Sequence, residues 1–505
     1  MSEGAAKKEE KTKKFQAIRG TRDLLPPETA LWSRAEQTAH EVFGTFGFRE
    51  IRVPIFEQTE LFARAVGGET DIVSKEMFSF VDRSDKLNPH PAIGTLDQHL
   101  QKIKDLQRTG EIPHDEIGIN LVEAAWNQVD QIFKGTSTSV DFAHDIYRLL
   151  MLFDGLKLGT DTSLRPEATA SVCRAYIEHN MNQLPQPVKL YYMGPMFRRE
   201  RPQKGRYRQF YQIGAEVLGG SDAPGIDAEL IEMVMTFFER LGLEGVELHI
   251  NCIGDKKCRP KYVELLRAEL CKVKDKLGPD SQRRIETNPL RVLDSKVENE
   301  QKMIEGMPHI ADHLCEECAE SYREVKKELE LRGVKYRENW RLVRGLDYYS
   351  RTTFEITARG LGSQNAVCGG GRYDGLMELL GGPPTRATGF AIGEDRLILS
   401  LQEAGKMTAP RGRDVYIAWM GEKAYGTAVR VAKNLRAAGF SVELPPLEQK
   451  FGKALGQADK LGARYALILG DNEVASGEWT LKTLATGQQA KFSEASLLEF
   501  LKKQE

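Results

Sequence analysis

The stretch Gly194–Glu216, with the sequence GPMFRRERPQKGRYRQFYQIGAE, decides the fold. On either side of its centre, Lys189–Met196 and Arg208–Leu218 alternate in character and contain aromatic and β-branched residues, which is typical of strands. Between these two runs lies a basic segment that contains Pro202 and Gly205. We therefore predict an antiparallel hairpin whose two strands are joined by a charged loop.

The loop of this predicted hairpin carries six cations within eleven residues, namely Arg198, Arg199, Arg201, Lys204, Arg206 and Arg208. Planar guanidinium groups match phosphate oxygens in bidentate fashion, so a polyphosphate or the end of an RNA chain would bind there. Charge alone leaves this interpretation evenly balanced against a solvated basic turn.

The second strand of the hairpin favours the functional interpretation. A period of two places Phe210, Gln212, Gly214 and Glu216 on one face, and this face carries polar groups that a simple core strand would lack. A carboxylate and an amide four residues apart can hold an amino group or an imidazole N–H next to ATP. We interpret the hairpin as a site that forms an adenylate.

Outward from the hairpin, the pattern changes several times along the chain. Leu31–Phe46 has helical periodicity that ends before Gly47, and Phe48–Glu57 follows as a predicted strand. Charged helical periodicity occupies Cys252–Asn339, and strand patterns resume at Arg341. The sheet that begins with the hairpin is therefore completed by segments that are distant in sequence.

Bulk composition limits the class of protein. The chain of 505 residues has 71 Lys plus Arg against 73 Asp plus Glu, so only local patches can attract a polyanion. It has no run of 18 apolar residues and no signal peptide, which predicts a cytoplasmic protein without membrane contact. Seven cysteines without a regular framework indicate free thiols in a reducing compartment.

The pair Cys315 and Cys318 is the one close pair of cysteines, and His309 and His313 precede it. Four such side chains are possible zinc ligands. A single CxxC within a helical pattern is, however, more typical of a helix surface and core. We therefore predict no metal site from the sequence.

Several segments together resemble the histidyl-tRNA synthetase family of the class II aminoacyl-tRNA synthetases. The hairpin is similar to class II motif 2, Gly47–Glu57 (GFREIRVPIFE) to motif 1, and Gly389–Leu397 (GFAIGEDRL) to motif 3. Further similar segments are Ile18–Pro26 (IRGTRDLLP), Ser163–Ala170 (SLRPEATA), Leu342–Glu355 (LVRGLDYYSRTTFE) and Cys368–Leu376 (CGGGRYDGL). The class I signatures HIGH and KMSKS and the Walker pattern are absent, so the resemblance favours a class II enzyme.

The resemblance implies an α+β fold. We expect a class II catalytic domain with a six-stranded antiparallel sheet and flanking helices at residues 15–410, after a disordered tail at residues 1–14. Helical insertions are expected at 85–162 and 252–339, the first of them foreign to the family pattern, and an α/β anticodon-binding domain at 411–505. The alternation of strands and helices in this last segment supports the separate domain.

The resemblance also implies site residues. The expected histidine-binding residues are Glu167, Ala168, Thr169, Gln212, Glu216, Tyr348, Tyr349 and Tyr373. The expected ATP-binding residues are Arg198, Glu200, Arg206, Arg344 and Arg396, of which Arg198 and Arg344 are also expected to be catalytic. Arg201 and Gln203 are expected to contact tRNA.

The implied reaction is the activation of L-histidine with ATP and Mg²⁺ to histidyl-adenylate and pyrophosphate, followed by transfer to the 3′ end of tRNA(His) in a homodimer. The alternative is a catalytically silent regulatory paralogue of ATP phosphoribosyltransferase. The sequence departs from the family at Ala168, where Gly is commoner, at Tyr211, where His is frequent, and at Glu394 and Asp395, where Leu-Glu is usual. The role of segment 85–162 stays open.

Overall fold

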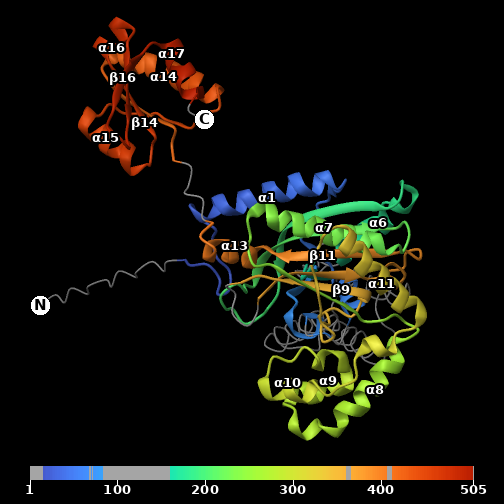
Figure 1. The fold of residues 1–505 in the computed structure, drawn as a ribbon. Helices are drawn as coiled ribbons and strands as arrows, with labels where there is room; N and C mark the ends of the chain where they lie inside the picture. The colour runs from blue at the N-terminus through green and yellow to red at the C-terminus, as the bar shows by residue number, and fades with distance from the viewer. Residues whose placement is uncertain are drawn as a thin grey trace, which may run out of the picture. The chain divides into compact units, whose positions relative to one another are not determined.

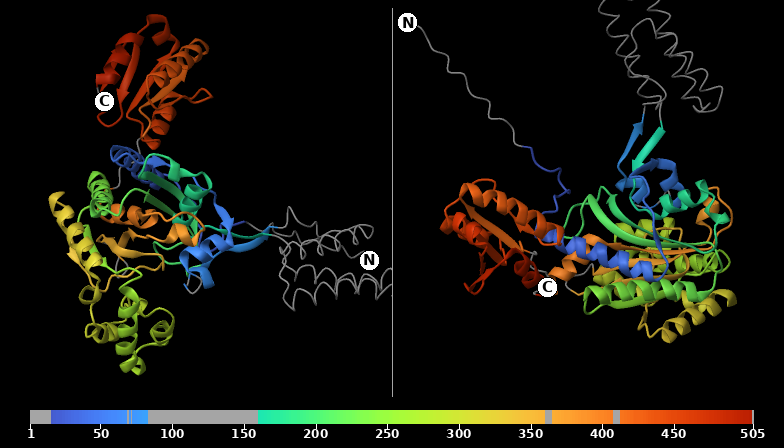
Figure 2. Two further views of the ribbon diagram at one scale, coloured as in Figure 1. Left: turned by 90° about the vertical axis from the view of Figure 1, so that its right-hand side faces the viewer. Right: turned by 90° about the horizontal axis from the view of Figure 1, so that it is seen from above.

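The computed structural model describes residues 15–67, 70, 72–82, 160–359, 365–406 and 412–503. The chain folds into two compact units (Figures 1 and 2). The larger unit comprises the described residues up to Leu24 and those from Trp32 to Lys406. The smaller unit comprises Leu25–Leu31 and the described residues after Met407. The expected tail 1–14 and residues 85–159 of the first expected insertion lie outside the described residues.

An eight-stranded sheet forms the centre of the larger unit, in the order β1-β5-β6-β11-β10-β9-β7-β8. The strands are β1 (Arg49–Glu50), β5 (Val188–Phe197), β6 (Gln209–Leu218), β7 (Glu247–Cys252), β8 (Arg337–Glu338), β9 (Ser350–Thr357), β10 (Ala366–Arg372) and β11 (Ala387–Gly393). The six inner strands pair antiparallel. The expected six-stranded antiparallel sheet is therefore confirmed, and a two-residue parallel strand extends it at each edge.

The predicted hairpin is β5 and β6, which pair antiparallel from Val188↔Leu218 to Phe197↔Gln209. The backbone N–H of Arg198 donates to the carbonyl of Arg208 at 2.9 Å and so closes the basic loop. On β6, Ile213 is fully buried and anchors the strand in the core. This anchoring fixes the strand that carries the predicted polar face.

Helices cover both faces of the sheet. They are α1 (Glu28–Thr45), α2 (Thr59–Val66), α6 (Thr169–Glu178), α7 (Pro224–Leu241), α8 (Arg259–Lys272), α9 (Pro279–Thr287), α10 (Glu298–Ile304), α11 (Glu316–Leu331), α12 (Leu376–Leu379) and α13 (Glu394–Glu403), with short turns η1 (Ile72–Glu76), η3 (Met181–Gln183), η4 (Lys274–Lys276), η5 (Pro289–Val292) and η6 (Ile310–His313). α1 and α7 lie along one side of the sheet, and α8, α9 and α10 form a group on the other side (Figure 1).

The predicted strand Phe48–Glu57 is wrong as a single element, because it splits into β1 and β2 (Phe56–Gln58). The break occurs at Val53 and Pro54, whose carbonyls accept hydrogen bonds from Arg165 Nη1 at 2.8 and 3.3 Å. Pro54 has no N–H to donate to a sheet ladder, so the strand ends there. Its carbonyl and that of Val53 bind the buried guanidinium of Arg165.

β2 belongs to a separate three-stranded sheet with β3 (Ser79–Asp82) and β4 (Thr160–Leu164). Residues 160–162, which the sequence analysis placed in the first insertion, form the start of β4. Asp82 pairs with Thr160, so the two residues that flank segment 83–159 are neighbours in this sheet.

The smaller unit is a five-stranded mixed sheet in the order β13-β12-β14-β15-β16, covered by helices. Its elements are β12 (Val415–Met420), α14 (Glu422–Ala437), β13 (Val442–Glu443), α15 (Phe451–Lys460), β14 (Tyr465–Gly470), α16 (Asp471–Ser476), β15 (Trp479–Thr483), β16 (Gln489–Phe492) and α17 (Glu494–Lys503). Apolar side chains fill both faces of β12 and β14, as expected for buried strands. Among the described helices of the whole chain, none has the length and apolar character needed to cross a membrane.

Candidate active site

A cavity of about 730 Å³ lies within the larger unit. Strands β6, β9, β10 and β11, the basic loop and the second insertion all contribute to its wall. The structure brings ten of the predicted site residues to this wall: Glu167, Thr169, Arg198, Glu200, Arg206, Gln212, Arg344, Tyr348, Tyr349 and Arg396. Segments that are distant in sequence therefore meet at one cavity.

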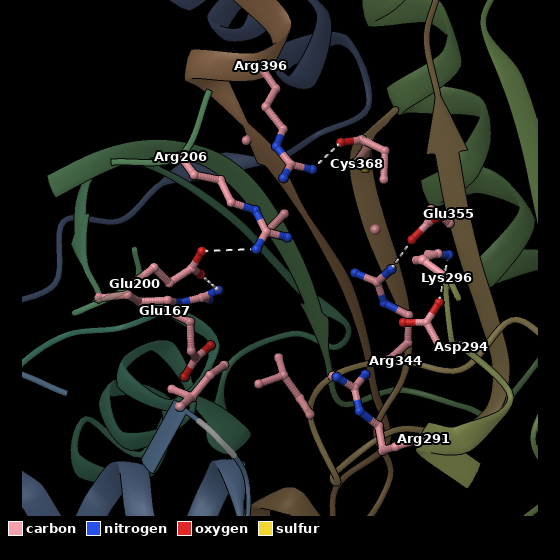
Figure 3. A pocket seen from close by; sticks show the side chains of 18 of the residues that line it. Glu167, Glu200, Arg206, Arg291, Asp294, Lys296, Arg344, Glu355, Cys368 and Arg396 are labelled. Atoms are coloured by element: carbon pink, nitrogen blue, oxygen red, sulfur yellow. Dashed lines mark hydrogen bonds and ion pairs between the residues drawn. The ribbon is translucent and has the colours of Figure 1, made fainter. Parts of the chain in front are cut away.

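Fixed positive charges surround the cavity (Figure 3). Arg198 Nε donates to the carbonyl of Pro166 at 2.9 Å, and Arg396 Nη1 donates to the carbonyl of Ala366 at 2.9 Å. Arg206 forms an ion pair with Glu200 at 3.2 Å. Each guanidinium is thus held by a neighbour before any ligand binds, which is the preorganisation that charge stabilisation requires.

The cations also repel one another. Burial lowers the pKa of Arg396, and the neighbouring positive charges of Arg206 and Arg198 lower it further. Burial likewise lowers the pKa of Arg291, and Arg284 and Arg344 add to that effect. A cavity where buried cations crowd together favours a polyanionic ligand, because that ligand relieves the repulsion.

Arg344 lines the cavity and forms an ion pair with Glu355 of β9 at 2.9 Å. Its Nε is buried and has no hydrogen-bond partner among the described residues. The side chain passes directly over Gly369 of β10, where an added Cβ would lie 1.9 Å from Arg344 Nη2. The glycine of CGGGRYDGL at this position is therefore what admits the arginine.

Two buried carboxylates lie near one another, Glu167 in the cavity wall and Glu216 behind it. Glu167 accepts the backbone N–H groups of Thr169 and Ala170 at 2.7 and 3.0 Å, at the start of α6. Glu216 accepts hydrogen bonds from Thr169 Oγ1 at 2.7 Å and from the Tyr373 hydroxyl at 2.6 Å. Both carboxylates are therefore held in place by hydrogen bonds.

Burial raises the pKa of Glu216 to about 8, although the hydrogen bonds from Tyr373 and Thr169 act in the opposite direction. The nearby charge of Glu167 adds to the increase. Burial also raises the pKa of Glu167 itself. A carboxyl group with a strongly raised pKa at a cavity is a mark of a functional site.

Five predicted site residues do not line the cavity. Glu216 lies behind Thr169, which lines the cavity and whose hydroxyl donates a hydrogen bond to the Glu216 carboxylate. Tyr373 lies behind Tyr348, and the centroids of the two rings are 5.6 Å apart. Ala168 is fully buried where α6 begins. Arg201 and Gln203 are exposed on the basic loop. The first three residues therefore support the wall, and the last two face solvent.

The sequence analysis missed part of the wall. Arg284, Arg291 and Lys296 of the second insertion line the cavity together with Asp294. The charged helical periodicity of that segment gave no sign that its cations differ from those of any solvated helix. Gln212 was predicted, and its Oε1 is buried without a hydrogen-bond partner among the described residues, so a polar ligand is needed to satisfy it.

Comparison with known proteins agrees with this geometry. Residues 156–400 match the family model of the tRNA synthetase class II core domain (G, H, P, S and T), and residues 414–504 match that of the anticodon binding domain. The chain is 46% identical over 492 residues to a histidine–tRNA ligase of Koribacter versatilis (strain Ellin345), covering 97% of this chain and 96% of the relative.

Two further relatives agree. A histidine–tRNA ligase of Solibacter usitatus (strain Ellin6076) is 46% identical over 483 residues, covering 95% of this chain and 97% of the relative. The crystal structure of apo S. aureus histidyl-tRNA synthetase matches with a TM-score of 0.69 and 32% identity, over 97% of this chain and 100% of that one.

Proposed function

The chain belongs to the histidine–tRNA ligases, and from this premise we propose which of its residues carry each step of the reaction. The enzyme is a class II ligase that activates L-histidine with ATP and joins it to tRNA(His). One observation carries the assignment of roles: Arg198 and Arg344 border the same cavity as Gln212 and Tyr349.

In the first step, a carboxylate oxygen of histidine attacks the α-phosphorus of ATP, and pyrophosphate leaves. Arg198 and Arg344 bind the α-phosphate and stabilise the negative charge that develops on it. Arg396 lies against the adenine and reaches the terminal phosphate, and Arg206 with Glu200 completes the nucleotide wall. No covalent intermediate with the protein is needed, so alignment and charge stabilisation supply the catalysis.

Histidine recognition uses the other wall. Glu167, Thr169 and Gln212 hold the α-amino group, and Ala168 fixes the start of α6 behind them. Glu216 and Tyr349 bind the imidazole nitrogens, with Tyr348 and Tyr373 closing the pocket around the ring. Glutamine or an apolar side chain would leave these buried groups unpaired, a penalty of about 1–3 kcal/mol for each group.

The residues present fit a magnesium ion bound with the nucleotide. The carboxylates of Glu200 and Glu355 border the cavity, and Mg²⁺ prefers carboxylate and phosphate oxygens. We propose these two side chains as its protein ligands. When bound, the ion supplies positive charge at the departing phosphates.

In the second step, the terminal ribose hydroxyl of tRNA attacks the carbonyl of histidyl-adenylate, and AMP leaves. We propose that Arg201 and Gln203 contact the acceptor end, since both are exposed on the loop that flanks the cavity. The smaller unit, which matches the anticodon binding model, binds the anticodon.

We also propose a homodimer that works in the cytoplasm. The motif 1 segment exposes Ile55 and Phe56 at 45% and 56%, and the Phe56 and Phe80 rings lie 6.4 Å apart. Exposed apolar groups of this kind are typical of an interface. All seven cysteines are free thiols, which suits a reducing compartment. Light scattering on the protein as it elutes from a size-exclusion column would give twice the chain mass for a dimer.

The regulatory paralogue of ATP phosphoribosyltransferase is not supported, because the relatives that match over nearly the full length are histidine–tRNA ligases. Histidine-dependent exchange between pyrophosphate and ATP tests the assignment. We expect exchange with L-histidine and not with the other amino acids. A chain that binds histidine and ATP but shows no exchange would contradict it.

A further inference from the structure

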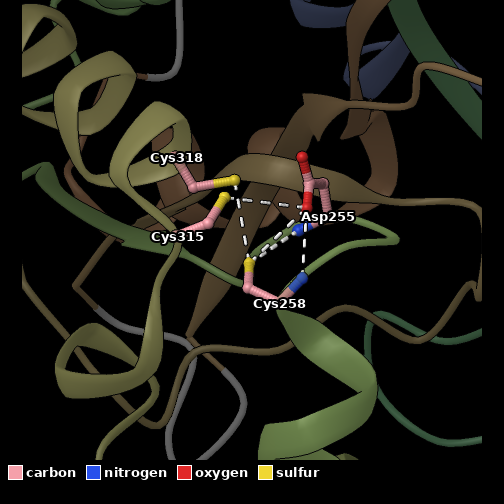
Figure 4. Close-up of side chains that lie close together, drawn as sticks. All are labelled: Asp255, Cys258, Cys315 and Cys318. Atoms are coloured by element: carbon pink, nitrogen blue, oxygen red, sulfur yellow. Dashed lines mark hydrogen bonds between the residues drawn. The ribbon is translucent and has the colours of Figure 1, made fainter.

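Four side chains with metal-binding atoms gather away from the cavity: Asp255, Cys258, Cys315 and Cys318 (Figure 4). Asp255 and Cys258 lie in the turn between β7 and α8, whereas Cys315 and Cys318 lie at the start of α11. Their Sγ and carboxylate oxygen atoms all lie within 4.8 Å of one another. The fold therefore brings an Asp-x-x-Cys segment against the CxxC pair.

Three of the six spacings among these atoms are known and lie close to the edges of a zinc tetrahedron. With Zn–S bonds of about 2.3 Å and Zn–O bonds of about 2.0 Å, tetrahedral ligands lie about 3.8 Å apart for two sulfurs and about 3.5 Å apart for sulfur and oxygen. Here Cys258 Sγ lies 3.8 Å from Cys318 Sγ and 3.5 Å from Asp255 Oδ1. Cys315 Sγ lies 4.0 Å from the same oxygen.

A disulfide does not explain this spacing, since bonded sulfurs lie only about 2.05 Å apart. The histidines considered in the sequence analysis are engaged elsewhere. The His309 ring stacks on Trp340 at 4.0 Å, and the His313 ring lies 5.8 Å from the Tyr262 ring. The neighbours of Cys315 and Cys318 are therefore Asp255 and Cys258, and not the two histidines.

The surroundings hold the candidate ligands in position. The backbone N–H of Asp255 donates to Cys258 Sγ at 3.4 Å, and Asp255 Oδ1 accepts the backbone N–H of Lys257 at 2.9 Å. The other carboxylate oxygen, Oδ2, lies 4.0 Å from Arg351 Nη2. Such outer contacts orient ligands in protein metal sites, and here they leave Oδ1 directed at the sulfurs.

We propose that Asp255, Cys258, Cys315 and Cys318 bind one Zn²⁺ ion. Thiolates select zinc over Mg²⁺ or Ca²⁺, and four protein ligands leave no open position, so the site is structural. It joins the turn after β7 to the start of α11, positions that lie 60 residues apart in the chain. Arg259, next to Cys258, donates to the carbonyl of Tyr349 at 2.7 Å, which links the site to the cavity wall.

Metal analysis of the full-length chain tests the proposal. The untagged protein is produced with zinc in the medium and dialysed against metal-free buffer, and its zinc is measured by mass spectrometry. We expect one zinc per chain in the wild type and in the control Cys271→Ser, whose thiol is exposed and outside the cluster. The double variant Cys258→Ser/Cys318→Ser is expected to lose at least nine-tenths of the metal.

Cobalt binding by the wild-type chain tests the same site without depending on whether a variant folds. Metal-free wild-type protein is titrated with Co²⁺ under reducing conditions. We expect thiolate-to-cobalt charge-transfer absorption that saturates at one equivalent and disappears on addition of Zn²⁺. Asp255→Cys should strengthen this absorption, and Asp255→Ala should weaken cobalt affinity at least tenfold.

Three results would overturn the proposal. The first is wild-type protein with less than a tenth of a zinc per chain and no charge-transfer band. The second is a double variant that folds and keeps its zinc. The third is a disulfide among the three cluster cysteines in protein isolated under non-reducing conditions.

Discussion

The guanidinium of Arg344 occupies the space that a side chain at Gly369 would fill: a Cβ there would lie 1.9 Å from Arg344 Nη2. The three nearest atoms to that position all belong to Arg344. We therefore expect Gly369→Ala to displace the arginine and lower the histidine-dependent exchange rate by at least about 10²-fold, the scale for loss of one preorganised charge donor. Steady-state exchange kinetics measure this.

Two glycine controls separate displacement of Arg344 from damage to the sheet. Gly44→Ala on α1 meets no atom within 4 Å and should leave the rate unchanged without lowering the melting temperature. At Gly370, an added Cβ would lie 2.4 Å from the carbonyl oxygen of Gly389, so Gly370→Ala should lower the melting temperature. A normal exchange rate in Gly369→Ala would show that Arg344 is not positioned as we describe.

Removal of the Arg344 charge is the second prediction. Arg344→Gln should lower the exchange rate by at least about 10²-fold, because the developing charge on the α-phosphate loses a fixed cation. The partner Glu355 would then lack its ion pair, so a melting curve must accompany the assay. Arg323→Ala, which removes an exposed arginine of α11, is the matched control and should retain full activity.

Glu216 predicts a pH dependence of stability. Its pKa is raised from 4.5 to about 8 in the folded chain, chiefly by burial. Below pH 4.5 the group is protonated in both states, and between 4.5 and 8 only the unfolded chain loses the proton. The free energy of unfolding should therefore fall as pH rises through that window, by up to a few kcal/mol.

Glu216→Gln should remove this dependence. Urea unfolding at several pH values between 5 and 9 would show the variant gaining stability relative to the wild type as pH rises. At pH 9, where Glu216 is ionised, the same variant should raise the KM for histidine at least about tenfold, because the imidazole loses a charged partner, with the KM for ATP little changed. A constant difference in stability across the pH range would show that Glu216 keeps an ordinary pKa.

Tyr373 predicts a shift in the same titration. Its hydroxyl donates to Glu216 at 2.6 Å, and this hydrogen bond lowers the pKa of Glu216. Only ionised Glu216 offers a charge to the imidazole, so the KM for histidine should rise as the pH falls through the pKa of Glu216. In Tyr373→Phe this pKa should rise further, so the increase in KM should begin at a higher pH. Tyr425→Phe, in the smaller unit, is the control. Superimposable KM profiles for wild type and Tyr373→Phe would exclude the role.

The local sequence pattern predicted the helices and strands that depend on residues close together in the chain. The hairpin of β5 and β6 followed from alternation around a basic loop, and the succession of strand and helix patterns marked the smaller unit. Alternation could not predict the break at Pro54, which depends on the distant Arg165. Alternation also gives no sign of β16, a largely exposed strand whose polar residues resemble a loop.

The cavity shows the same division. Resemblance to known motifs supplied the ten predicted residues that line it, whereas Arg291 came from a helical insertion whose charges look like any solvated surface. The partners of Cys315 and Cys318 were hidden for a related reason. Asp255 and Cys258 lie 60 residues earlier, and only the fold brings the turn after β7 against the start of α11.

A crystal structure with a non-hydrolysable analogue of histidyl-adenylate tests the central claim most directly. We predict that the group replacing the α-phosphate will lie between the guanidiniums of Arg198 and Arg344. The imidazole is predicted to lie within hydrogen-bond distance of Glu216. A complex with the imidazole bound away from Glu216, or with either arginine turned from the phosphate position, would contradict the account.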